Sequence, residues 1–299
     1  MNLTRCSRGS LVTTKSIVTG AGGFIGKALV SRQVAEGIDV IALNSSAGDI
    51  QDVNTLSPYS GEDITRVFHL AARTYVPDSW DDPQSFYATN LLGTTNVLEY
   101  CRQNEVRLTF VSAYVYGQPA TLPIDEDATV QPNNPYALSK YLAEQACRYY
   151  ADNFGLSVTI IRPFNIYGIG QDMKFLIPSI VKQTLCDSTI VVQDLEPRRD
   201  YLYLDDLVDA VIATSQIDSG FEIYNVGYGE SLSVKDVIDQ AQGVAGTTKE
   251  IISNNRVRQQ EIPDVVANIS KIKKHLGWSP ATTFDEGLKK LFQSLQEQL

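Results

Sequence analysis

The stretch Ser16-Ile17-Val18-Thr19-Gly20-Ala21-Gly22-Gly23-Phe24-Ile25-Gly26 decides the fold of this chain. A short apolar run leads into a glycine-rich turn, which is followed by an amphipathic stretch over residues 27–36 and a second apolar run over 40–43. Strand, turn, helix and strand in this order form one βαβ unit, and such a unit builds a parallel sheet.

The three spaced glycines give the turn its predicted role. Gly20 permits the tight turn, Gly23 lets a diphosphate approach the backbone, and Gly26 lets the helix pack on the strand. The free amides at the start of the helix, around Phe24 and Ile25, then face the phosphates. The turn therefore predicts a dinucleotide site, although its spacing is GxxGxxG and not the GxGxxG of the dehydrogenases that define the motif.

The same alternation of strand and helix continues along the chain. Further strands are expected over residues 66–70, 108–111 and 158–161, and helices over 85–104 and 135–153. Apolar strands without polar alternation indicate a parallel sheet covered on both faces. After Pro163 the segments become shorter, and helices are expected over residues 176–184, 204–214, 234–242 and 286–298.

The predicted fold is therefore α/β, a Rossmann-type doubly wound parallel sheet with a smaller C-terminal α/β substrate lobe. We expect an N-terminal extension over residues 1–15, an NAD(P)-binding domain over 16–165 with a return segment near 199–215, and mostly the substrate lobe over 166–299.

Composition narrows the range of partners. The 299 residues include 25 Lys and Arg against 35 Asp and Glu, a net charge of −10, which argues against nucleic acid as a partner. Two histidines and four scattered cysteines offer no ligand cluster, so no metal site is expected. No apolar run is long enough to span a membrane, and the N-terminus lacks the apolar core of a secretory signal. We expect a soluble cytoplasmic protein with reduced thiols.

The second apolar run ends at Asn44-Ser45-Ser46, where an NAD site usually offers a carboxylate to the ribose hydroxyls. No carboxylate and no arginine stands there, whereas the three polar side chains can donate to the 2′-phosphate of NADP. The sequence thus predicts NADP or NAD as cofactor, with a slight preference for NADP. Asp49 and Ile50 follow without room for a full helix, and we include them in the cofactor site.

The stretch from Asn134 to Lys140 carries the predicted chemistry. Asn134 suits a helix cap and Pro135 the first helical position, so Tyr136 and Lys140 lie one turn apart on one face. A free tyrosine has a pKa of about 10, and a nearby ammonium is expected to lower it toward neutrality. Ser112, which follows the strand over residues 108–111, can hydrogen-bond the substrate oxygen that exchanges a proton with Tyr136.

With these motifs in place, the sequence resembles the extended short-chain dehydrogenase/reductase family, also called the NAD-dependent epimerase/dehydratase family. The resemblance extends from Ile17 to the C-terminal helix. Besides the glycine turn and Tyr136 to Lys140, it rests on His69-Leu70-Ala71-Ala72, Asn90-Leu91-Leu92-Gly93-Thr94, Ser112-Ala113-Tyr114-Val115-Tyr116-Gly117, Arg162-Pro163-Phe164-Asn165-Ile166-Tyr167-Gly168, Arg199-Asp200-Tyr201 and Leu276-Gly277-Trp278-Ser279-Pro280.

The resemblance implies a nucleotide-sugar substrate in a cleft between two lobes. It implies Ser112, Tyr136 and Lys140 as catalytic residues, with Tyr136 and Lys140 also touching the cofactor. Further cofactor contacts are implied at Leu70, Ala71, Ala72, Asn90 and Pro163, and substrate contacts at Tyr114, Asn165, Arg199 and Arg258. Glu261 stands where an acidic residue follows the second arginine in the family. Local arginines make physical sense in an acidic protein, because a diphosphate needs bidentate cationic donors.

The reaction is narrowed by the residues after Ser112. Dehydratases of the family carry an acid pair there, but this chain has Ala113 and Tyr114, so dehydration is disfavoured. A reductase of an NDP-4-keto-6-deoxyhexose and a 4-epimerase with tightly bound NAD both fit the Ser, Tyr and Lys set. The short connection from Leu43 to Asp49 and the missing carboxylate resemble the sugar-nucleotide reductases, which we therefore favour. A catalytically silent regulatory subunit is the alternative of another class, and the intact set argues against it.

Two structural expectations complete the prediction. His69 is expected to be structural, held by backbone hydrogen bonds, and not to act as a base. The helices over 85–104 and 135–153 are expected to pack across a homodimer, as in many members of the family; a monomer whose helices merely cover the sheet is the alternative.

Overall fold

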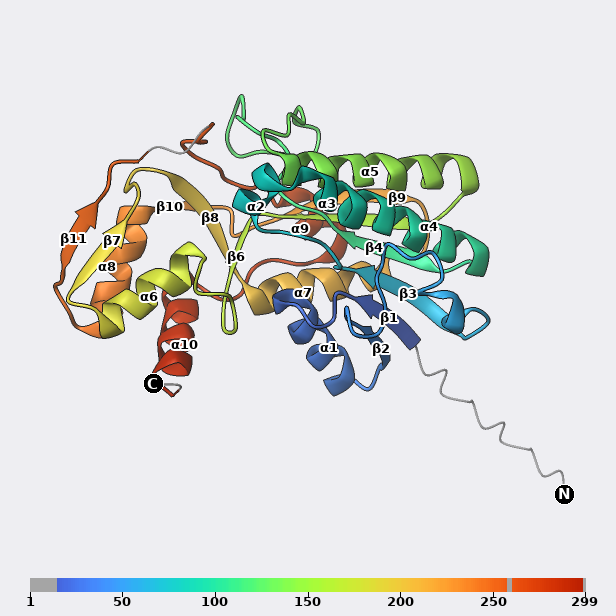
Figure 1. Cartoon of the computed structure of the whole chain (residues 1–299), viewed down its shortest axis with the longest axis horizontal. Coiled ribbons are helices and arrows are strands. Elements are labelled where there is room, and N and C mark those ends of the chain that lie inside the picture. The colour runs from blue at the N-terminus through green and yellow to red at the C-terminus, as the bar shows by residue number, and fades with distance from the viewer. Residues whose placement is uncertain (1–14, 257–259, 298–299) are drawn as a thin grey trace, which may run out of the picture.

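A computed structural model describes residues 15–256 and 260–297, and its centre is a six-stranded parallel sheet (Figure 1). The strands run in the order β2-β1-β3-β4-β5-β9. Their bounds are β1 Lys15–Thr19, β2 Asp39–Leu43, β3 Ile64–His69, β4 Arg107–Val111, β5 Val158–Pro163 and β9 Phe221–Val226. Every residue of β5 is buried, as expected of a strand with helices on both faces. The predicted doubly wound α/β fold is confirmed.

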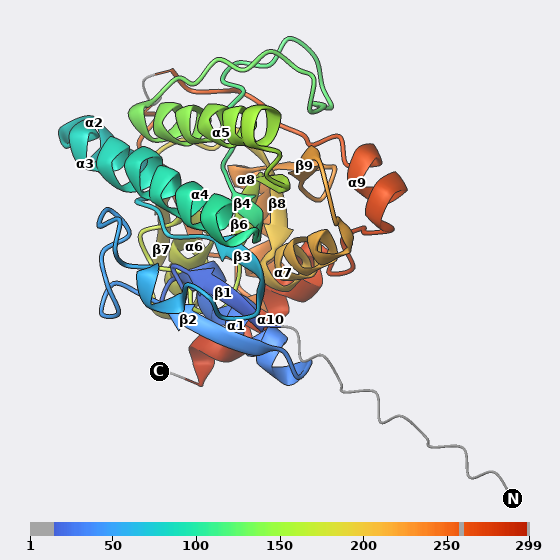
Figure 2. The ribbon, with the colours of Figure 1, turned by 90° about the vertical axis from the view of Figure 1, so that its right-hand side faces the viewer.

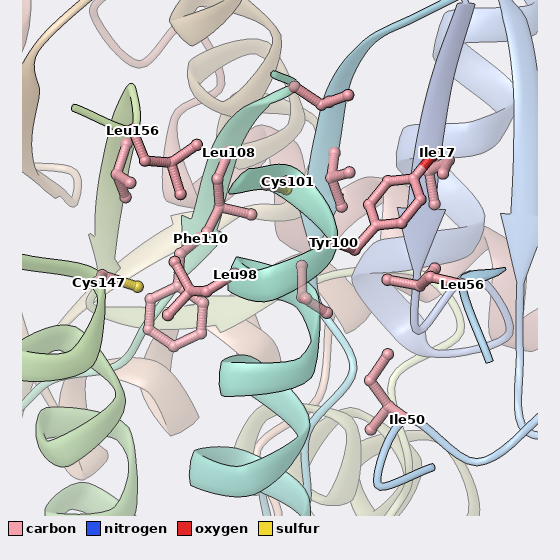
Figure 3. Close-up of a cluster of buried hydrophobic side chains, with 14 of the residues drawn as sticks. Ile17, Ile50, Leu56, Leu98, Tyr100, Cys101, Leu108, Phe110, Cys147 and Leu156 are labelled. Atoms are coloured by element: carbon pink, nitrogen blue, oxygen red, sulfur yellow. The ribbon is translucent and has the colours of Figure 1, made fainter. Parts of the chain in front are cut away.

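Helices cover both faces of this sheet. In Figure 1, α2 (Val76–Asp81), α3 (Pro83–Tyr87), α4 (Gly93–Asn104) and α5 (Pro135–Phe154) lie above it, and α1 (Phe24–Ala35) and α7 (Leu204–Ala213) lie below it. Figure 3 shows one of the cores that result, in which Leu98 and Cys101 of α4 pack against Leu108 and Phe110 of β4.

The order of the strands places the predicted site. The chain leaves β1 for β2 on one side and returns to β3 on the other, so the strand order reverses between β1 and β3. Ligands of open α/β sheets bind at such a point, outside the carboxyl ends of the strands. The glycine turn follows β1 directly and therefore lies at this crevice.

A smaller lobe carries the remaining elements, at the left of Figure 1. It holds a three-stranded sheet of β10 (Ser231–Ser233), β8 (Arg198–Tyr203) and β6 (Asn165–Tyr167), and a pair of β11 (Glu250–Ser253) and β7 (Thr189–Val192). Helices α6 (Leu176–Cys186), α8 (Val234–Ala245) and α10 (Phe284–Gln296) share its core. Helix α9 (Ser270–Leu276) packs near β9 instead.

Several boundaries differ from the predicted ones. Helix α1 begins at Phe24 and not near residue 27, because Gly23 is extended and serves as its N-cap. The predicted helix over 85–104 begins at Pro83, capped by Asp82, and is widened by a π turn over Ala88–Leu92. Strand β9, which has no predicted counterpart, pairs with β5 and completes the sheet. Its second residue, Glu222, interrupts the apolar run and hides the pattern of a buried strand.

No helix within the described residues is long and apolar enough to cross a membrane.

Candidate active site

The glycine turn is built by close backbone contacts at two of its three glycines. Gly20 has a φ of +70°, and a Cβ there would lie 2.6 Å from the nitrogen of Ala71. A Cβ on Gly26 would lie 2.1 Å from the oxygen of Gly20. Neither position accepts a side chain, because atoms cannot approach this closely without moving the backbone.

Gly23 differs from both, since it is exposed and a Cβ there would meet only Gly20 O, at 3.3 Å. The first helical hydrogen bond runs from Lys27 N to Gly23 O at 3.0 Å, so the amides of Phe24 and Ile25 precede the helical ladder. An open backbone cradle beside free amides is what a diphosphate requires. The residues present therefore fit a dinucleotide.

The loop after β3 closes the other side of the crevice. The hydroxyl of Thr19 accepts from Leu70 N at 3.2 Å and from Ala71 N at 3.3 Å, which fixes the loop beside the turn. Leu70, Ala71 and Ala72 are half-buried there. His69 is fully buried, and its ring bonds the side chains of Thr19 (2.6 Å) and Thr94 (3.0 Å) and not the predicted backbone. Burial lowers its pKa to about 3, so the imidazole is neutral at neutral pH.

Asn90 lies in the π turn and joins three segments. Its amide donates to Arg73 O at 3.0 Å and to Ser139 Oγ at 2.9 Å, and it accepts from Arg73 N at 2.8 Å. Ser139 in turn donates to Tyr136 O. Both N–H groups of Asn90 are thus committed, and the residue, fully buried, holds the loop after β3 against the start of α5.

Asn44 lies at the end of β2 in a tight turn. Its Oδ1 accepts from Ser46 N at 3.0 Å and Ala47 N at 3.3 Å, so no helix forms before Ile50. A Cβ on Gly22 would lie 3.2 Å from Asn44 Cβ, which puts this turn against the glycine turn. Asn44, Ser45 and Ser46 are exposed.

Asp49 and Ile50, which were predicted to belong to the cofactor site, differ in their exposure to solvent. Asp49 is exposed, and its carboxylate accepts from its neighbour Gln51 at 3.0 Å. Ile50 is buried in the core that Figure 3 shows. A Cβ on Gly93 would lie 2.7 Å from its side chain, which explains the glycine at the start of α4.

Helix α5 carries Tyr136 and Lys140 one turn apart, and Lys140 reaches β4. Its cap is as predicted, because Asn134 Oδ1 accepts from Ala137 N at 2.8 Å and Pro135 takes the first position. Tyr136 is half-buried, with its ring edge-on to Phe86 at 6.3 Å.

The predicted effect of Lys140 on Tyr136 is wrong for this arrangement. Lys140 Nζ donates to Val111 O at 2.7 Å and lies 4.0 Å from the centre of the Phe110 ring. Burial lowers the pKa of Lys140 to about 7, although the Glu144 carboxylate opposes the shift. Burial also raises the pKa of Tyr136, and no charge offsets it. The ammonium is held down on the strand, so Tyr136 is a protonated phenol at neutral pH.

Ser112 belongs to a buried polar network that the sequence analysis missed. Its Oγ donates to Glu144, whose carboxylate also accepts from Nη2 of Arg162 at 2.6 Å. Glu144 is placed one turn beyond Lys140, on the helix face that carries Tyr136. A carboxylate at this spacing on the face of a predicted site, with an arginine in a neighbouring strand, was the signal available in the sequence.

The predicted substrate residues lie where β6 and β8 enter the smaller lobe. Asn165 is half-buried on β6 and donates to Asp200 O at 3.4 Å. Arg199 donates to Ile262 O at 2.7 Å and pairs with Glu261. The acidic residue expected after the second arginine therefore binds the first.

Two other residues predicted to contact substrate or cofactor, Tyr114 and Pro163, are packed against their neighbours. Tyr114 donates to Gly117 O at 2.7 Å and packs edge-on to Phe164. Pro163 is buried at the end of β5. Arg258 lies outside the described residues. Within the described ranges, no group of three or more His, Cys, Asp and Glu side chains is placed to hold a metal ion.

Comparison with known proteins identifies the class of this chain. Residues 16–227 match the NAD dependent epimerase/dehydratase family, and the chain belongs to that family. It is 31% identical to the GDP-6-deoxy-D-mannose reductase of Pseudomonas aeruginosa, over 96% of this chain and 99% of the relative. It is also 31% identical to a putative UDP-glucose 4-epimerase of Methanocaldococcus jannaschii, over 92% and 96%. A solved structure of RMD from Pseudomonas aeruginosa, complexed with NADPH, has a TM-score of 0.89 and 29% identity over 96% of this chain and 100% of that one.

Proposed function

We propose that this protein reduces a nucleoside-diphosphate-linked 4-keto-6-deoxyhexose with NADPH, and that the nucleoside is guanosine. The chain is an NAD(P)-dependent enzyme of the nucleotide-sugar family. Reduction of a GDP-linked sugar is supported by the similarity, end to end, to a GDP-6-deoxy-D-mannose reductase.

The turn at Asn44 carries the preference for a reductase. Reductases use the cofactor as a consumed reagent, which in cells is usually NADPH. The Asn44 turn lies against the glycine turn, and its exposed hydroxyls and amide offer donors for a 2′-phosphate without a carboxylate to repel it. The Ser, Tyr and Lys set alone does not separate reduction from epimerisation.

In the proposed reaction the cofactor supplies the hydride, and the residues of the chain supply the proton and bind both ligands. A bound nicotinamide cofactor supplies the hydride for C4 of the sugar. The glycine turn would hold its diphosphate at Gly23 and the amides of α1. Lys140, whose Nζ bonds Val111 O in this structure, would have to turn away from the strand to reach its ribose. Tyr136, a protonated phenol, donates the proton to the sugar O4. Arg199 and Asn165 bind the nucleoside diphosphate of the substrate.

Turnover with and without added cofactor tests this proposal. The protein is incubated with GDP-4-keto-6-deoxy-D-mannose and NADPH, and in parallel with UDP-glucose and no added reductant. We expect one NADPH oxidised for each alcohol formed in the first mixture. The second candidate is a 4-epimerase, because the chain is equally identical to an epimerase. Conversion of UDP-glucose to its C4 epimer without reductant, with no NADPH loss in the first mixture, would establish that activity instead.

We predict that Asn44→Asp moves the cofactor preference toward NAD. Oδ1 already accepts two backbone amides, so an aspartate keeps the turn and changes only the outward group from a donor to an anion. The new charge repels the 2′-phosphate and accepts from ribose hydroxyls. We expect the NADPH-to-NADH ratio of kcat/KM to fall roughly tenfold, which corresponds to about 1.4 kcal/mol.

Ser45→Ala is the matched comparison, because it removes one proposed donor from the same turn without adding charge, and we expect a smaller fall in the ratio. An Asn44→Asp enzyme that keeps the original ratio would remove Asn44 from the phosphate site.

The outer face of α4 and α5 supports the proposal of a homodimer. The two helices lie side by side in Figure 2. Large apolar side chains are exposed on α5 and at the end of the π turn before α4: Leu92 (49%), Leu138 (37%), Leu142 (37%), Tyr149 (59%) and Phe154 (52%). Leu138, Leu142 and Tyr149 form one stripe along α5. Such a stripe fits the same helices of a second copy.

We predict that Leu142→Glu converts the dimer to a monomer, because a buried unpaired carboxylate opposes association. Light scattering coupled to size exclusion measures the mass. Val34→Glu, at a residue of α1 that is 58% exposed, is expected to leave the dimer intact. A wild-type protein that runs as a monomer at micromolar concentration would contradict the proposed interface.

A further inference from the structure

Tyr136, Lys140 and Glu144 follow one another at single turns along α5, and the proposed chemistry uses only the first two. Glu144 is 1% exposed. Its carboxylate accepts from Arg162 Nε at 3.1 and 3.2 Å and from Arg162 Nη2 at 2.6 Å. The Nε and Nη2 edge of the guanidinium thus forms a two-pronged ion pair with the carboxylate. A buried ion pair of this kind is weak evidence for stability, so stability alone does not account for it.

The same carboxylate accepts a hydrogen bond from the hydroxyl of Ser112. A hydroxyl has one proton and two lone pairs, and an ionised carboxylate only accepts hydrogen bonds. The single proton of Ser112 is therefore committed to Glu144. What Ser112 can still offer to a reacting sugar oxygen is a lone pair.

The other end of the Arg162 guanidinium, Nη1, is also held by hydrogen bonds. This nitrogen donates to the hydroxyl of Tyr116 at 2.9 Å, and that hydroxyl donates to Asn225 Oδ1 at 2.6 Å. Arg162, Tyr116 and Asn225 are all buried. The guanidinium cannot swing away from Glu144 without leaving polar groups unpaired in the core.

We propose that Glu144, clamped by Arg162, is a positioning residue that sets the direction of the Ser112 hydrogen bond, so that Ser112 accepts from the sugar hydroxyl and does not donate to the ketone. This inference rests on the proposed reduction and deepens it. Tyr136 is then the sole proton donor of this set to the keto oxygen. After the proton has moved from the Tyr136 hydroxyl to O4, the new sugar hydroxyl donates to Ser112, which favours the alcohol over the ketone.

Glu144→Gln is the variant that reverses this direction. Its amide oxygen can take the place that accepts from Arg162 Nη2, and its amide nitrogen then faces Ser112 and donates to it. The Ser112 proton is released toward the sugar oxygen. The side chain keeps its size and the two bonds that Arg162 makes to the oxygen away from Ser112, from Nε at 3.2 Å and from Nη2 at 2.6 Å, and it loses only the 3.1 Å bond from Nε.

The test compares binding of two ligands without turnover. Calorimetry gives the affinities for the alcohol GDP-6-deoxy-D-mannose and for GDP-4-keto-6-deoxy-D-mannose, with no reduced cofactor present. In the wild-type background, we expect Ser112→Ala to lower the affinity for the alcohol roughly three- to tenfold, which is the contribution of one hydrogen bond. The affinity for the ketone should change by no more than about twofold. In the Glu144→Gln background, Ser112→Ala should lower the affinity for the ketone instead.

Equal loss for both ligands in the Ser112→Ala protein would overturn the proposal, and this arm does not require Glu144→Gln to fold. Arg66→Gln is the matched control, since Arg66 is a second buried arginine, bonded to Thr109 at 3.0 Å near the opposite ends of the strands. It should alter stability without changing the ligand preference.

Urea unfolding of Ser112→Ala, Glu144→Gln and the double variant separates this inference from the proposed function. We expect the two changes to be non-additive, because Ser112→Ala removes the hydrogen bond whose direction Glu144→Gln reverses. Additive losses would refute the role of Glu144. Non-additive losses in a protein that binds neither GDP-sugar would refute the proposed substrate and leave the Ser112 to Glu144 bond standing.

Discussion

Replacing Tyr136 with Phe lowers turnover by roughly two to four orders of magnitude, the usual contribution of a general acid, while NADPH affinity stays at its wild-type value. The ring and its edge-on contact with Phe86 at 6.3 Å are retained, so the fold and the start of α5 are preserved. Only the hydroxyl is removed. Since burial raises the pKa of Tyr136, the wild-type residue enters the reaction as a phenol, as reduction requires. Steady-state rates with calorimetric cofactor binding measure both parts.

Tyr114→Phe is the matched control for this prediction. Tyr114 is the other tyrosine implied at the site, but its hydroxyl already donates to Gly117 O at 2.7 Å, and burial raises its pKa too. We expect a small loss of turnover. If Tyr136→Phe kept near-wild-type turnover while Tyr114→Phe lost it, the proton would come from Tyr114 instead.

The fold was predictable because its signals are local. Glycines with fixed spacing, a capped helix at Asn134 and apolar strands are each visible within a few residues of sequence. Strand β9 was not, since it pairs with β5 only after the chain has passed through the smaller lobe, and Glu222 interrupts its apolar run. The π turn at Asn90 was also hidden, because an extra residue in a helical turn leaves the composition unchanged.

The residues of the candidate site could be proposed from the sequence, but their hydrogen bonds could not. Tyr136 and Lys140 lie one turn apart on α5, and Lys140 bonds the residue before Ser112. Their partners depend on distant contacts: Lys140 bonds the backbone of β4, and Ser112 bonds Glu144, whose partner Arg162 comes from β5. Sequence spacing shows that Tyr136 and Lys140 share a helix face, but it cannot show which way a lysine turns once it is buried.

Substitutions in the glycine turn are expected to have the second large effect, on cofactor affinity at Gly23 and on stability at Gly26, because the two glycines have different surroundings. Gly23 has a φ of −78° and a ψ of 175°, which any residue adopts, and it is exposed. Gly26 has no room, since a Cβ there would lie 2.1 Å from Gly20 O. A side chain at Gly23 therefore projects into the cradle, whereas one at Gly26 breaks the contact between α1 and β1.

We predict that Gly23→Val lowers NADPH affinity on the order of a hundredfold, because about two charge-assisted hydrogen bonds from the helix amides to the diphosphate are lost. Thermal unfolding should stay cooperative, with the modest loss expected when glycine leaves an N-cap. Gly26→Ala should instead lose stability and cofactor binding together. Calorimetry and thermal denaturation of both variants decide the matter: unchanged NADPH affinity in a folded Gly23→Val protein would place the diphosphate away from this turn, and the proposed site would have to move with it.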